Sequence, residues 1–453
     1  MPASRPQQKL ADAAGFLFDA AVASEAIYDA IIIGGGPGGS AAAGFLARAG
    51  RRVLVLEREV FPRFHIGESL LPYNTGLFEE LGVLAKLKAA GLVRKTGAQF
   101  HAGNGSRSAQ FIFRQGCFTR QTETFQVERA TFDHLLLQHA RELGAEVREG
   151  WTVQRFEVRA DRVSVEATGP DGQRHVREGR FLIDASGRGN VTGNQEGLRQ
   201  FHHHHNKVSV FGHFRGVQLD PGERGGDTVI VRLEDKWFWI IPLSAEKTSV
   251  GVVMEAAEFA RLKKSPEEIF HQMVGASSVM RTRLAAASTV GKIHVTSDFS
   301  YHNRRFASPR LLRVGDAAGF IDPIFSSGVF LAMNSGKLAA GVVDESLTAG
   351  DDGSRRLADY ERKVWAALRI YWDLIEGFYT QPFFELMLTP RPPLRLGAAV
   401  TALLAGELHG GWSIRWRMWL FRWLVRIQGR WPFVPRVSWT PLPDNPKAAH
   451  ATA

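Results

Sequence analysis

The sequence predicts an α/β protein in which a doubly wound parallel sheet is interleaved with an antiparallel sheet and followed by a helical C-terminal region. Three observations indicate this fold. An apolar run near the start of the chain leads through a glycine-rich turn into a helix, and several short strands alternate over residues 207–255. After about residue 381 the composition changes, because Trp, Arg, Leu and Pro become frequent. Helices and strands that alternate in this way favour a layered α/β architecture.

The first element is the turn that follows Ala30–Ile33, an apolar run typical of a buried parallel strand. The turn, Gly34–Gly39, fits the pattern G-x-G-x-x-G. In this pattern Gly34 permits the tight turn, Gly36 lets the backbone approach a pyrophosphate, and Gly39 lets the next helix pack against the strand. The turn therefore predicts a phosphate-binding loop.

A helix and a second strand complete this unit. The helix Ser40–Ala49 directs its N-terminal amides at the phosphates. The strand over 52–56 ends in Glu57, an acid placed to accept hydrogen bonds from ribose hydroxyls. Because strand, glycines, helix, strand and acid occur in this order, the pattern indicates a dinucleotide-binding unit and not an unrelated glycine-rich turn.

Two later strand ends are of the same kind. Asp184 begins the loop DASGR, and Gly315–Asp316 follows an apolar strand. Asp316 is placed to hold the ribityl chain of a flavin, and the small residues after it let the backbone approach the ring. A single Rossmann unit lacks these two stretches, so the three together predict FAD and not NAD.

Composition limits the class of protein further. The 453 residues are ample for a large core, and the net charge of +10 favours acidic partners, although no nucleic-acid motif accompanies it. The single cysteine, Cys117, excludes an internal disulfide and suits a reducing compartment. No apolar run approaches the length of a membrane span, and we reject the reading of residues 9–26 as an export signal. We therefore expect a cytoplasmic protein.

The chain divides into an extension over 1–27, a core over 28–380 and a helical C-terminal subdomain over 381–453. Residues 11–26 are expected to form a short amphipathic helix, and two long helices are expected near 256–286 and 328–348. In the core, the nucleotide module is expected over about 28–115, 130–200 and 293–348, and the substrate module over about 95–130 and 205–292.

Over roughly residues 28–375 the sequence resembles the glutathione-reductase-like flavoproteins and, within them, the flavin-dependent halogenases of the phenol and pyrrole type. Three motifs carry the second resemblance. Trp237–Pro242 matches W-x-W-x-I-P, Lys95 lies on a strand 28 residues after Gly67, and Asp322–Val329 resembles the halide loop of the family. The resemblance implies a glutathione-reductase-like FAD-binding Rossmann domain joined to an antiparallel substrate domain.

The resemblance implies that indoles shield the flavin from other substrates. Trp237 and Trp239 share one face of a strand, because side chains on a strand alternate. With Pro242, Pro323 and Phe325 they are expected to shield the flavin and a tunnel that leads away from it. Without the other motifs, the same stretch is also compatible with a sandwich-core strand that contains two tryptophans.

The resemblance also assigns the catalytic and halide-binding groups. Lys95 is the expected catalytic residue at the end of the tunnel, where it holds hypohalous acid or becomes a haloamine. A lone lysine is otherwise usually a solvated surface residue. Chloride or bromide is expected at the amides of Ser327 and Gly328, which begin a helix. The same Ser-Ser pair is also expected to cap this helix, whether or not a halide binds.

FAD, as FADH2, is the cofactor that the resemblance implies, and a separate flavin reductase is the partner that supplies it. No metal is expected. The residues expected to bind the cofactor are Gly34, Gly36, Pro37, Gly38, Gly39, Ser40, Glu57, Arg58, Glu68, Ser69, Arg129, Asp184, Gly315, Asp316, Gly328 and Val329.

One departure from the family narrows the substrate. Tryptophan-type halogenases carry a glutamate at the place of Phe325, just before Ser326. The carboxylate that polarises tryptophan in that subclass is therefore missing, which favours an electron-rich phenol or pyrrole, either free or tethered to an acyl carrier protein. Two rivals on the same fold are a single-component flavin hydroxylase and a geranylgeranyl-reductase-like enzyme. A flavin-binding protein associated with a membrane is the non-catalytic rival.

Two stretches have no assigned role. Four adjacent histidines, His202–His205, cannot all face one metal on a strand and lack a spaced partner, so we expect a solvated loop. The basic aromatic stretch Trp412–Trp431 is compatible with a membrane surface, with docking of an acidic carrier protein, or with a helix that packs its Trp and Leu face on the core. We prefer the helix packed on the core.

Overall fold

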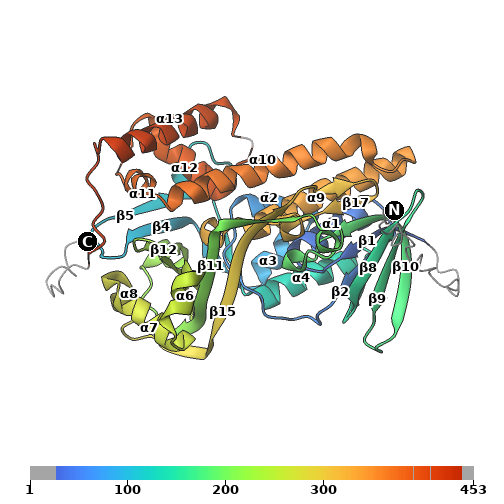
Figure 1. Ribbon diagram of the computed structural model, residues 1–453, viewed down its shortest axis with the longest axis horizontal. Coiled ribbons are helices and arrows are strands. Elements are labelled where there is room, and N and C mark those ends of the chain that lie inside the picture. Colours follow the sequence, from blue (N-terminus) through green and yellow to red (C-terminus); the bar gives the residue numbers. More distant parts are fainter. Residues whose placement is uncertain (1–26, 391, 409, 441–453) are drawn as a thin grey trace, which may run out of the picture.

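The computed structural model describes residues 27–390, 392–408 and 410–440. The molecule is elongated, with one sheet toward each end and long helices running along one side (Figure 1). The helix expected over 11–26 lies outside the described residues. Within them, the α/β fold class predicted from the sequence is confirmed.

The first sheet is the nucleotide-binding sheet. Its strands follow the order β16-β17-β10-β1-β2-β7, and β8 and β9 extend it beyond β10. β17, β10, β1, β2 and β7 run parallel, with Ile32 in register with Val55 and Ile183. The strands are β1 (Tyr28–Ile33), β2 (Val53–Glu57), β7 (Glu146–Glu149), β8 (Thr152–Val158), β9 (Val163–Thr168), β10 (Arg174–Asp184), β16 (Ala307–Ser308) and β17 (Leu311–Arg313).

Helices pack beside this sheet and beside one another. The helix after the glycine turn, α1 (Pro37–Arg48), packs against α4 (Arg129–Glu142) and α9 (Gly328–Ala349). Gly336 permits the contact with α9, since a Cβ there would lie 2.5 Å from the carbonyl oxygen of Gly38. The remaining helices here are α2 (Tyr73–Leu81), α3 (Leu84–Ala89) and α5 (Val191–Gln195).

The second sheet follows the order β18-β15-β11-β14-β13-β12-β4-β5. Of the predicted antiparallel meander, the hairpins β12–β13 and β13–β14 are confirmed, but β11 pairs with β14 and not with β12, so the four strands do not follow one another in a simple meander. The strands are β4 (Gly97–Ala102), β5 (Ser108–Ile112), β11 (Arg199–Arg215), β12 (Thr228–Arg232), β13 (Trp237–Ser244), β14 (Lys247–Glu255), β15 (Ser288–Asn303) and β18 (Gly319–Phe320). A separate two-stranded sheet pairs β3 (Val93–Lys95) with β6 (Thr124–Gln126).

Three features of this half differ from the sequence expectation. The helix expected over 256–286 is divided into α6 (Ala256–Leu262), α7 (Pro266–Gly275) and α8 (Ser278–Arg283), because Ser265 and Ser277 each cap a new helix. The four histidines fall within β11 and not in the expected loop, at the point where the pairing of β11 with β15 shifts register between Phe201 and Asn206. Residues 293–303, expected in the nucleotide module, belong to β15 in the second sheet.

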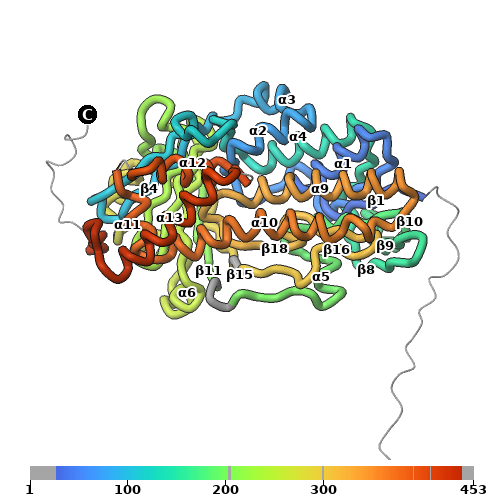
Figure 2. The backbone as a smooth tube through the Cα atoms, turned by 90° about the horizontal axis from the view of Figure 1, so that it is seen from above, coloured from blue at the N-terminus to red at the C-terminus, as the bar shows by residue number. Residues whose placement is uncertain are grey.

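The C-terminal region is helical, as expected, and comprises α11 (Gln381–Met387), α12 (Leu396–Ala405) and α13 (Gly411–Arg430). The long helix α10 (Ser354–Phe378) precedes it and runs beside α9, as seen from above (Figure 2). The guanidinium of Arg232 on β12 donates hydrogen bonds to the carbonyl oxygens of Phe378, Tyr379 and Thr380, which joins this region directly to the second sheet. No helix among the described residues is long and apolar enough to cross a membrane.

Candidate active site

A cavity of about 660 Å³ lies between the two sheets and collects most of the residues expected at the site. Its solvent-exposed lining includes Arg58, His65 and Gly67, so the cavity meets solvent along the segment that follows β2. The expected site residues that line the cavity are Gly34, Gly36, Pro37, Gly38, Glu57, Arg58, Glu68, Ser69, Arg129, Trp237, Trp239, Gly315, Asp316, Pro323, Ser327, Gly328 and Val329. Gly39, Ser40, Lys95, Asp184, Pro242 and Phe325 lie outside its lining.

Gly34, Gly36 and Gly39 of the first turn are each glycine for a different structural reason. Gly34 has φ +98°, and a Cβ on it would lie 2.4 Å from the carbonyl oxygen of Ala185. A Cβ on Gly39 would lie 1.9 Å from the carbonyl oxygen of Gly34. A Cβ on Gly36 would instead point into open space and meet only Arg63 Nη2, at 3.7 Å. The chain itself therefore requires two of these glycines, whereas the third leaves a hollow that suits a pyrophosphate.

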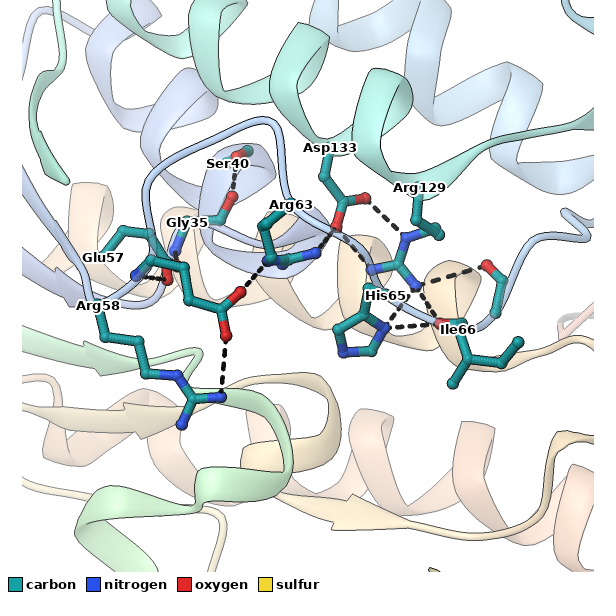
Figure 3. A network of polar contacts seen from close by, with 11 residues as sticks. Gly35, Ser40, Glu57, Arg58, Arg63, His65, Ile66, Arg129 and Asp133 are labelled. Atoms are coloured by element: carbon teal, nitrogen blue, oxygen red, sulfur yellow. Dashed lines mark hydrogen bonds and ion pairs between the residues drawn. The ribbon is translucent and has the colours of Figure 1, made fainter. Parts of the chain in front are cut away.

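Glu57 stands at the end of β2 and is held by backbone amides. Its Oε2 accepts a hydrogen bond from the Gly35 amide at 2.6 Å, and its Oε1 accepts one from the Glu59 amide at 2.8 Å. Ser40 does not line the cavity, but its hydroxyl donates to the Gly35 carbonyl at 2.8 Å and fixes the turn from behind (Figure 3). The acid is thus fixed beside the glycine turn, where a ribose is expected.

An arginine pair anchors the segment between β2 and α2. Arg129 forms a two-pronged contact with the fully buried Asp133, at 2.7 and 2.8 Å, and also donates to the Ile66 carbonyl at 2.8 Å. Arg63 donates to Asp133 Oδ2 at 2.9 Å, the oxygen that also accepts from Arg129 Nη2 (Figure 3). Because Arg63 also faces Gly36, it is the cation nearest the hollow that suits a pyrophosphate. Arg63 was not predicted from the sequence, although the stretch that contains it, FPRFHIGESLLP, follows closely after the strand that ends in Glu57.

The other two strand-end loops meet this turn. Asp184 is fully buried and accepts hydrogen bonds from the Ser186 amide and from the amide and hydroxyl of Thr192, at 2.6 to 3.0 Å. It therefore shapes the loop after β10 from behind the cavity wall. Gly315 has φ +58°, and Asp316, which follows it, lines the cavity.

The loop expected to hold the halide leads into α9. Ser326 adopts φ +56°, and Ser327, the residue before the first helical turn, makes no capping hydrogen bond with its side chain. Asp322 caps the short 3-10 turn Pro323–Phe325 instead, by accepting from the Ile324 amide at 2.9 Å. A Cβ on Gly328 would meet nothing within 4 Å. The expected Ser-Ser cap is therefore not realised, and the start of α9 faces the cavity.

The tryptophan motif forms a wall of the cavity. Trp237, Trp239 and Ile241 all line it, as the alternation of side chains along a strand predicts. The indole of Trp239 donates to Ser249 Oγ at 3.0 Å and packs against Gly251, where a Cβ would come within 2.3 Å of the ring. A strand neighbour with any side chain would therefore displace this indole.

A hydrogen-bonded chain connects this wall to the halide loop. The indole N–H of Trp237 donates to the hydroxyl of Tyr379 at 3.0 Å, and that hydroxyl donates to Asp322 Oδ2 at 2.8 Å. Burial and the neighbouring Asp322 raise the pKa of Tyr379 well above its usual value, so the phenol stays protonated and able to donate. Tyr379 follows α10, and no sequence motif pointed to it.

Lys95 is buried, with 2% of its surface exposed, and lies behind the cavity wall. Its ammonium donates to Ser69 Oγ at 2.8 Å and to the Leu70 carbonyl at 2.9 Å. Ser69 Oγ also lies 2.8 Å from Thr228 Oγ1, and both hydroxyl residues line the cavity. These two hydroxyls therefore separate the lysine from the cavity, and the surface-lysine alternative is wrong.

Burial lowers the pKa of Lys95 to about 7, and the carboxylate of Asp227 partly opposes this shift. Asp227 is itself buried and accepts a hydrogen bond from Gln110 Nε2 at 3.0 Å, while Thr96 and Gln99 approach it at 3.4 and 3.5 Å. Both protonation states of the lysine are therefore accessible near neutral pH. The sequence reasoning did not identify Asp227, which lies far from Lys95 in the chain.

Two expected shielding residues lie away from the cavity. Pro242 lines a second hollow, with Arg94 and Thr96, on the other side of β3. Phe325 is buried, and its ring packs against Phe100 and Phe378 at centroid distances of 6.5 and 5.8 Å. No carboxylate takes the place of Phe325 in this aromatic cluster.

The cavity fits FAD on its own geometry. It runs without a break from the hollow at Gly36 to the wall at Trp237, and Glu68 contributes a buried carboxylate between these ends. Glu68 Oε1 lies 2.8 Å from His213 Nε2, whereas Oε2 is buried with no partner among the described residues. An unpaired buried oxygen that lines a cavity indicates a bound polar group. The described residues contain no group of side chains that could hold a metal ion.

Comparisons with known proteins agree with this geometry. A family model described as an FAD binding domain matches residues 27–369. A 1H-pyrrole-2-carbonyl-[peptidyl-carrier protein] chlorinase of Pseudomonas fluorescens is 30% identical, over 85% of this chain and 90% of its own length. A tryptophan 2-halogenase of Chondromyces crocatus is 34% identical, over 77% of this chain and 67% of its own length. The solved structure of the flavin-dependent brominase Bmp2 is 29% identical and superposes with a TM-score of 0.80, covering 89% of this chain and 100% of that chain.

The resemblance to halogenases that the three motifs predicted is therefore confirmed, and neither the hydroxylase nor the reductase alternative is favoured. The cofactor is FAD, and a halide is a substrate of the reaction. The chain belongs to the flavin-dependent halogenases and is an FAD-dependent oxidoreductase that halogenates an aromatic ring.

Proposed function

We propose that this halogenase acts on a pyrrole-type ring that is carried as an acyl group on a peptidyl carrier protein. Two observations support this substrate class. The chlorinase of Pseudomonas fluorescens, which matches this chain over 85% of its length, is named for such a substrate. In addition, the buried aromatic cluster around Phe325 holds no carboxylate to polarise an indole, so the ring must already be electron-rich.

The proposal gives each end of the cavity its own task. Bound reduced FAD supplies the oxygen-activating chemistry that oxidises the halide. The hollow at Gly36 and the carboxylate of Glu57 hold the cofactor, and the amides of Ser327 and Gly328 hold the halide at the positive end of α9. The wall formed by Trp237 and its neighbours excludes water, which protects the oxidised halogen from loss.

Lys95 holds hypohalous acid for attack by the ring. The buried ammonium already donates to Ser69 and to the Leu70 carbonyl, which leaves one N–H of the ammonium for the oxygen of hypohalous acid. The ring carbon then bonds to the halogen, and the oxygen leaves as hydroxide and takes up a proton. The ring carbon loses its own proton, so water is the by-product. The burial of Lys95 directly behind the cavity wall, with one N–H left over, is the observation that carries the proposed halogenation step.

Two partners complete the proposed reaction. A separate flavin reductase supplies the reduced cofactor, and the carrier protein delivers the acyl ring. A net charge of +10 attracts an acidic carrier. A cytoplasmic location, where reduced nucleotides are available to the reductase, belongs to the same proposal.

The test is mass spectrometry of three substrates after incubation with the enzyme, FAD, a flavin reductase, oxygen and chloride or bromide. The substrates are pyrrole-2-carboxyl-loaded carrier protein, free pyrrole-2-carboxylate and a free phenol. We expect a halogenated product from the loaded carrier, with turnover that falls as ionic strength rises. Halogenation of the free phenol alone, with no response to salt, would replace the carrier by a small arene. Hydroxylated product formed without halide would contradict the proposal entirely.

A further inference from the structure

The outer face of α13 carries a stripe of exposed tryptophans. Trp412, Trp419 and Trp423 are 78%, 66% and 48% exposed, and Trp416 lies between them. Steps of four, three and four residues place these side chains on one side of the helix. The expectation that the tryptophans of Trp412–Trp431 pack on the core is therefore wrong for these three indoles and for Trp431, which is also exposed. α13 lies at the outer edge of the molecule (Figure 1).

The opposite face of α13 is the one that packs. Ile414, Met418 and Phe421 are buried. Gln428 is also buried, and its amide donates to Glu385 Oε2 at 2.7 Å and to the Val434 carbonyl at 2.8 Å. The helix is therefore firmly seated on α11 and α12 by other side chains. The outward tryptophans contribute no core contacts that would explain them.

Arginines flank this tryptophan stripe, and no acid does so within the helix. Residues 411–430 contain five arginines and neither Asp nor Glu. Arg415, Arg422, Arg426 and Arg430 are exposed, and Arg422 pairs with Asp373 of α10. Trp431 and Phe433, 65% and 54% exposed, extend the apolar surface beyond the helix end. Such a face pairs indoles, which favour the boundary between water and lipid, with cations that favour anionic headgroups.

Two other occupants fit this face less well. A second copy of the chain would bring arginine against arginine, with no acid on α13 to compensate. A carrier protein bound here would sit on the wrong side of α11 and α12, because these helices separate α13 from the second sheet, and no α13 residue lines the cavity. A planar anionic surface meets neither difficulty.

We propose that α13 binds the surface of a membrane that contains anionic lipid. The helix lies in the plane of the headgroups, with the tryptophan stripe at the acyl boundary and the arginines on lipid phosphates. This mode of binding requires no spanning segment, and none occurs among the described residues. The inference does not depend on the identity of the arene or of its carrier.

The test is co-sedimentation of the full chain with phosphatidylcholine vesicles, prepared with and without phosphatidylglycerol. We expect binding to the vesicles that contain phosphatidylglycerol, together with a blue shift of tryptophan emission. A triple variant, Trp412→Ala, Trp419→Ala and Trp423→Ala, should bind these vesicles with an affinity at least about tenfold lower than that of the wild type. Arg415→Gln with Arg426→Gln should lose the preference for anionic lipid. Trp365→Ala, which removes an exposed tryptophan of α10 outside the stripe, is the matched control and should bind like the wild type.

Because these indoles are exposed, the triple variant should retain bound flavin and unfold at the same temperature as the wild type. Both quantities are measured in parallel. Absence of vesicle binding by the wild type, or equal binding by the triple variant, overturns the proposal. A dimer in light scattering that the triple variant loses would assign the face to a second copy. If the wild type and the control variant capture a loaded carrier protein and the triple variant does not, the tryptophan face of α13 is a binding site for the carrier.

Discussion

The two ends of the cavity are built in different ways. At the cofactor end, Gly34, Gly36 and Glu57 lie within a single strand–turn–helix–strand unit, and backbone atoms form most of the surface. At the other end, Lys95 lies behind the cavity wall, and the two hydroxyls in front of it, those of Ser69 and Thr228, come from segments 159 residues apart. We therefore expect backbone atoms to recognise the cofactor and a buried network of side chains to set the chemistry of the lysine.

This difference predicts different consequences of mutation. A change in the glycine turn either blocks the ligand or disrupts the chain's own packing, depending on which glycine is changed. A change near Lys95 leaves the cofactor in place and alters only what happens to the oxidised halogen. Each of the following experiments separates the two ends.

The largest effect is expected from Gly36→Val. The new side chain enters the hollow that suits a pyrophosphate, so flavin binding and all activity should be lost while the chain still folds. Absorbance of bound flavin after gel filtration and thermal unfolding of the flavin-free protein measure the two effects. Gly39→Ala is the contrasting control, because its Cβ meets backbone and should cost about 1–3 kcal/mol of stability. Flavin retained by Gly36→Val would show that the turn does not bind the cofactor.

The next largest effect is expected from Lys95→Ala. Halogenated product should fall by about 10²–10⁴-fold, because the group that holds hypohalous acid is lost. Bound flavin and peroxide release should remain, since the lysine does not line the cofactor end. Product by mass spectrometry is compared with peroxide released, and Lys292→Ala, an exposed lysine of β15, serves as the control. Near-normal halogenation by Lys95→Ala would refute the catalytic role.

A smaller effect is expected from Asp227→Asn, and it concerns pH. The pKa of Lys95 is lowered to about 7, so the lysine loses its proton as pH rises through this value, and product per flavin oxidised should fall there. Because the Asp227 carboxylate raises the pKa of Lys95, its neutralisation should move this fall to lower pH. Asp220→Asn, which removes a carboxylate paired with Arg283, should leave the profile in place. A pH profile that is unchanged in Asp227→Asn would show that Asp227 does not influence the pKa of Lys95.

The smallest effect is expected from Tyr379→Phe, which removes the hydroxyl that connects the tryptophan wall to the halide loop. The indole of Trp237 and one oxygen of Asp322 lose this contact, so stability should fall by about 1–3 kcal/mol. The ratio of peroxide to halogenated product should also rise, because the wall excludes water less well. Tyr371→Phe, whose weak hydrogen bond to Leu403 lies elsewhere, is the control and should leave the ratio unaltered.

The sequence was sufficient to predict the strand–turn–helix–strand unit and the two hairpins of the second sheet. A glycine turn between a strand and a helix is a local pattern, so Gly36 and Glu57 could be assigned from neighbouring residues alone. The alternation of side chains in β13 likewise predicted that Trp237 and Trp239 share one face. Lys95 was identified only by resemblance, because nothing adjacent to it in the chain shows that it is buried.

Tertiary structure alone decided the remaining features. Asp227, Tyr379 and Arg63 act through contacts with distant segments, and no spacing in the sequence encodes such contacts. The direction of α13 was undetermined for a related reason. Its tryptophan stripe and its stripe of Ile414, Met418 and Phe421 have the same helical period, so either face could have been buried. Only the packing of α13 on α11 and α12 showed which face is left to solvent, because periodicity defines the faces of a helix but not the surface that each one meets.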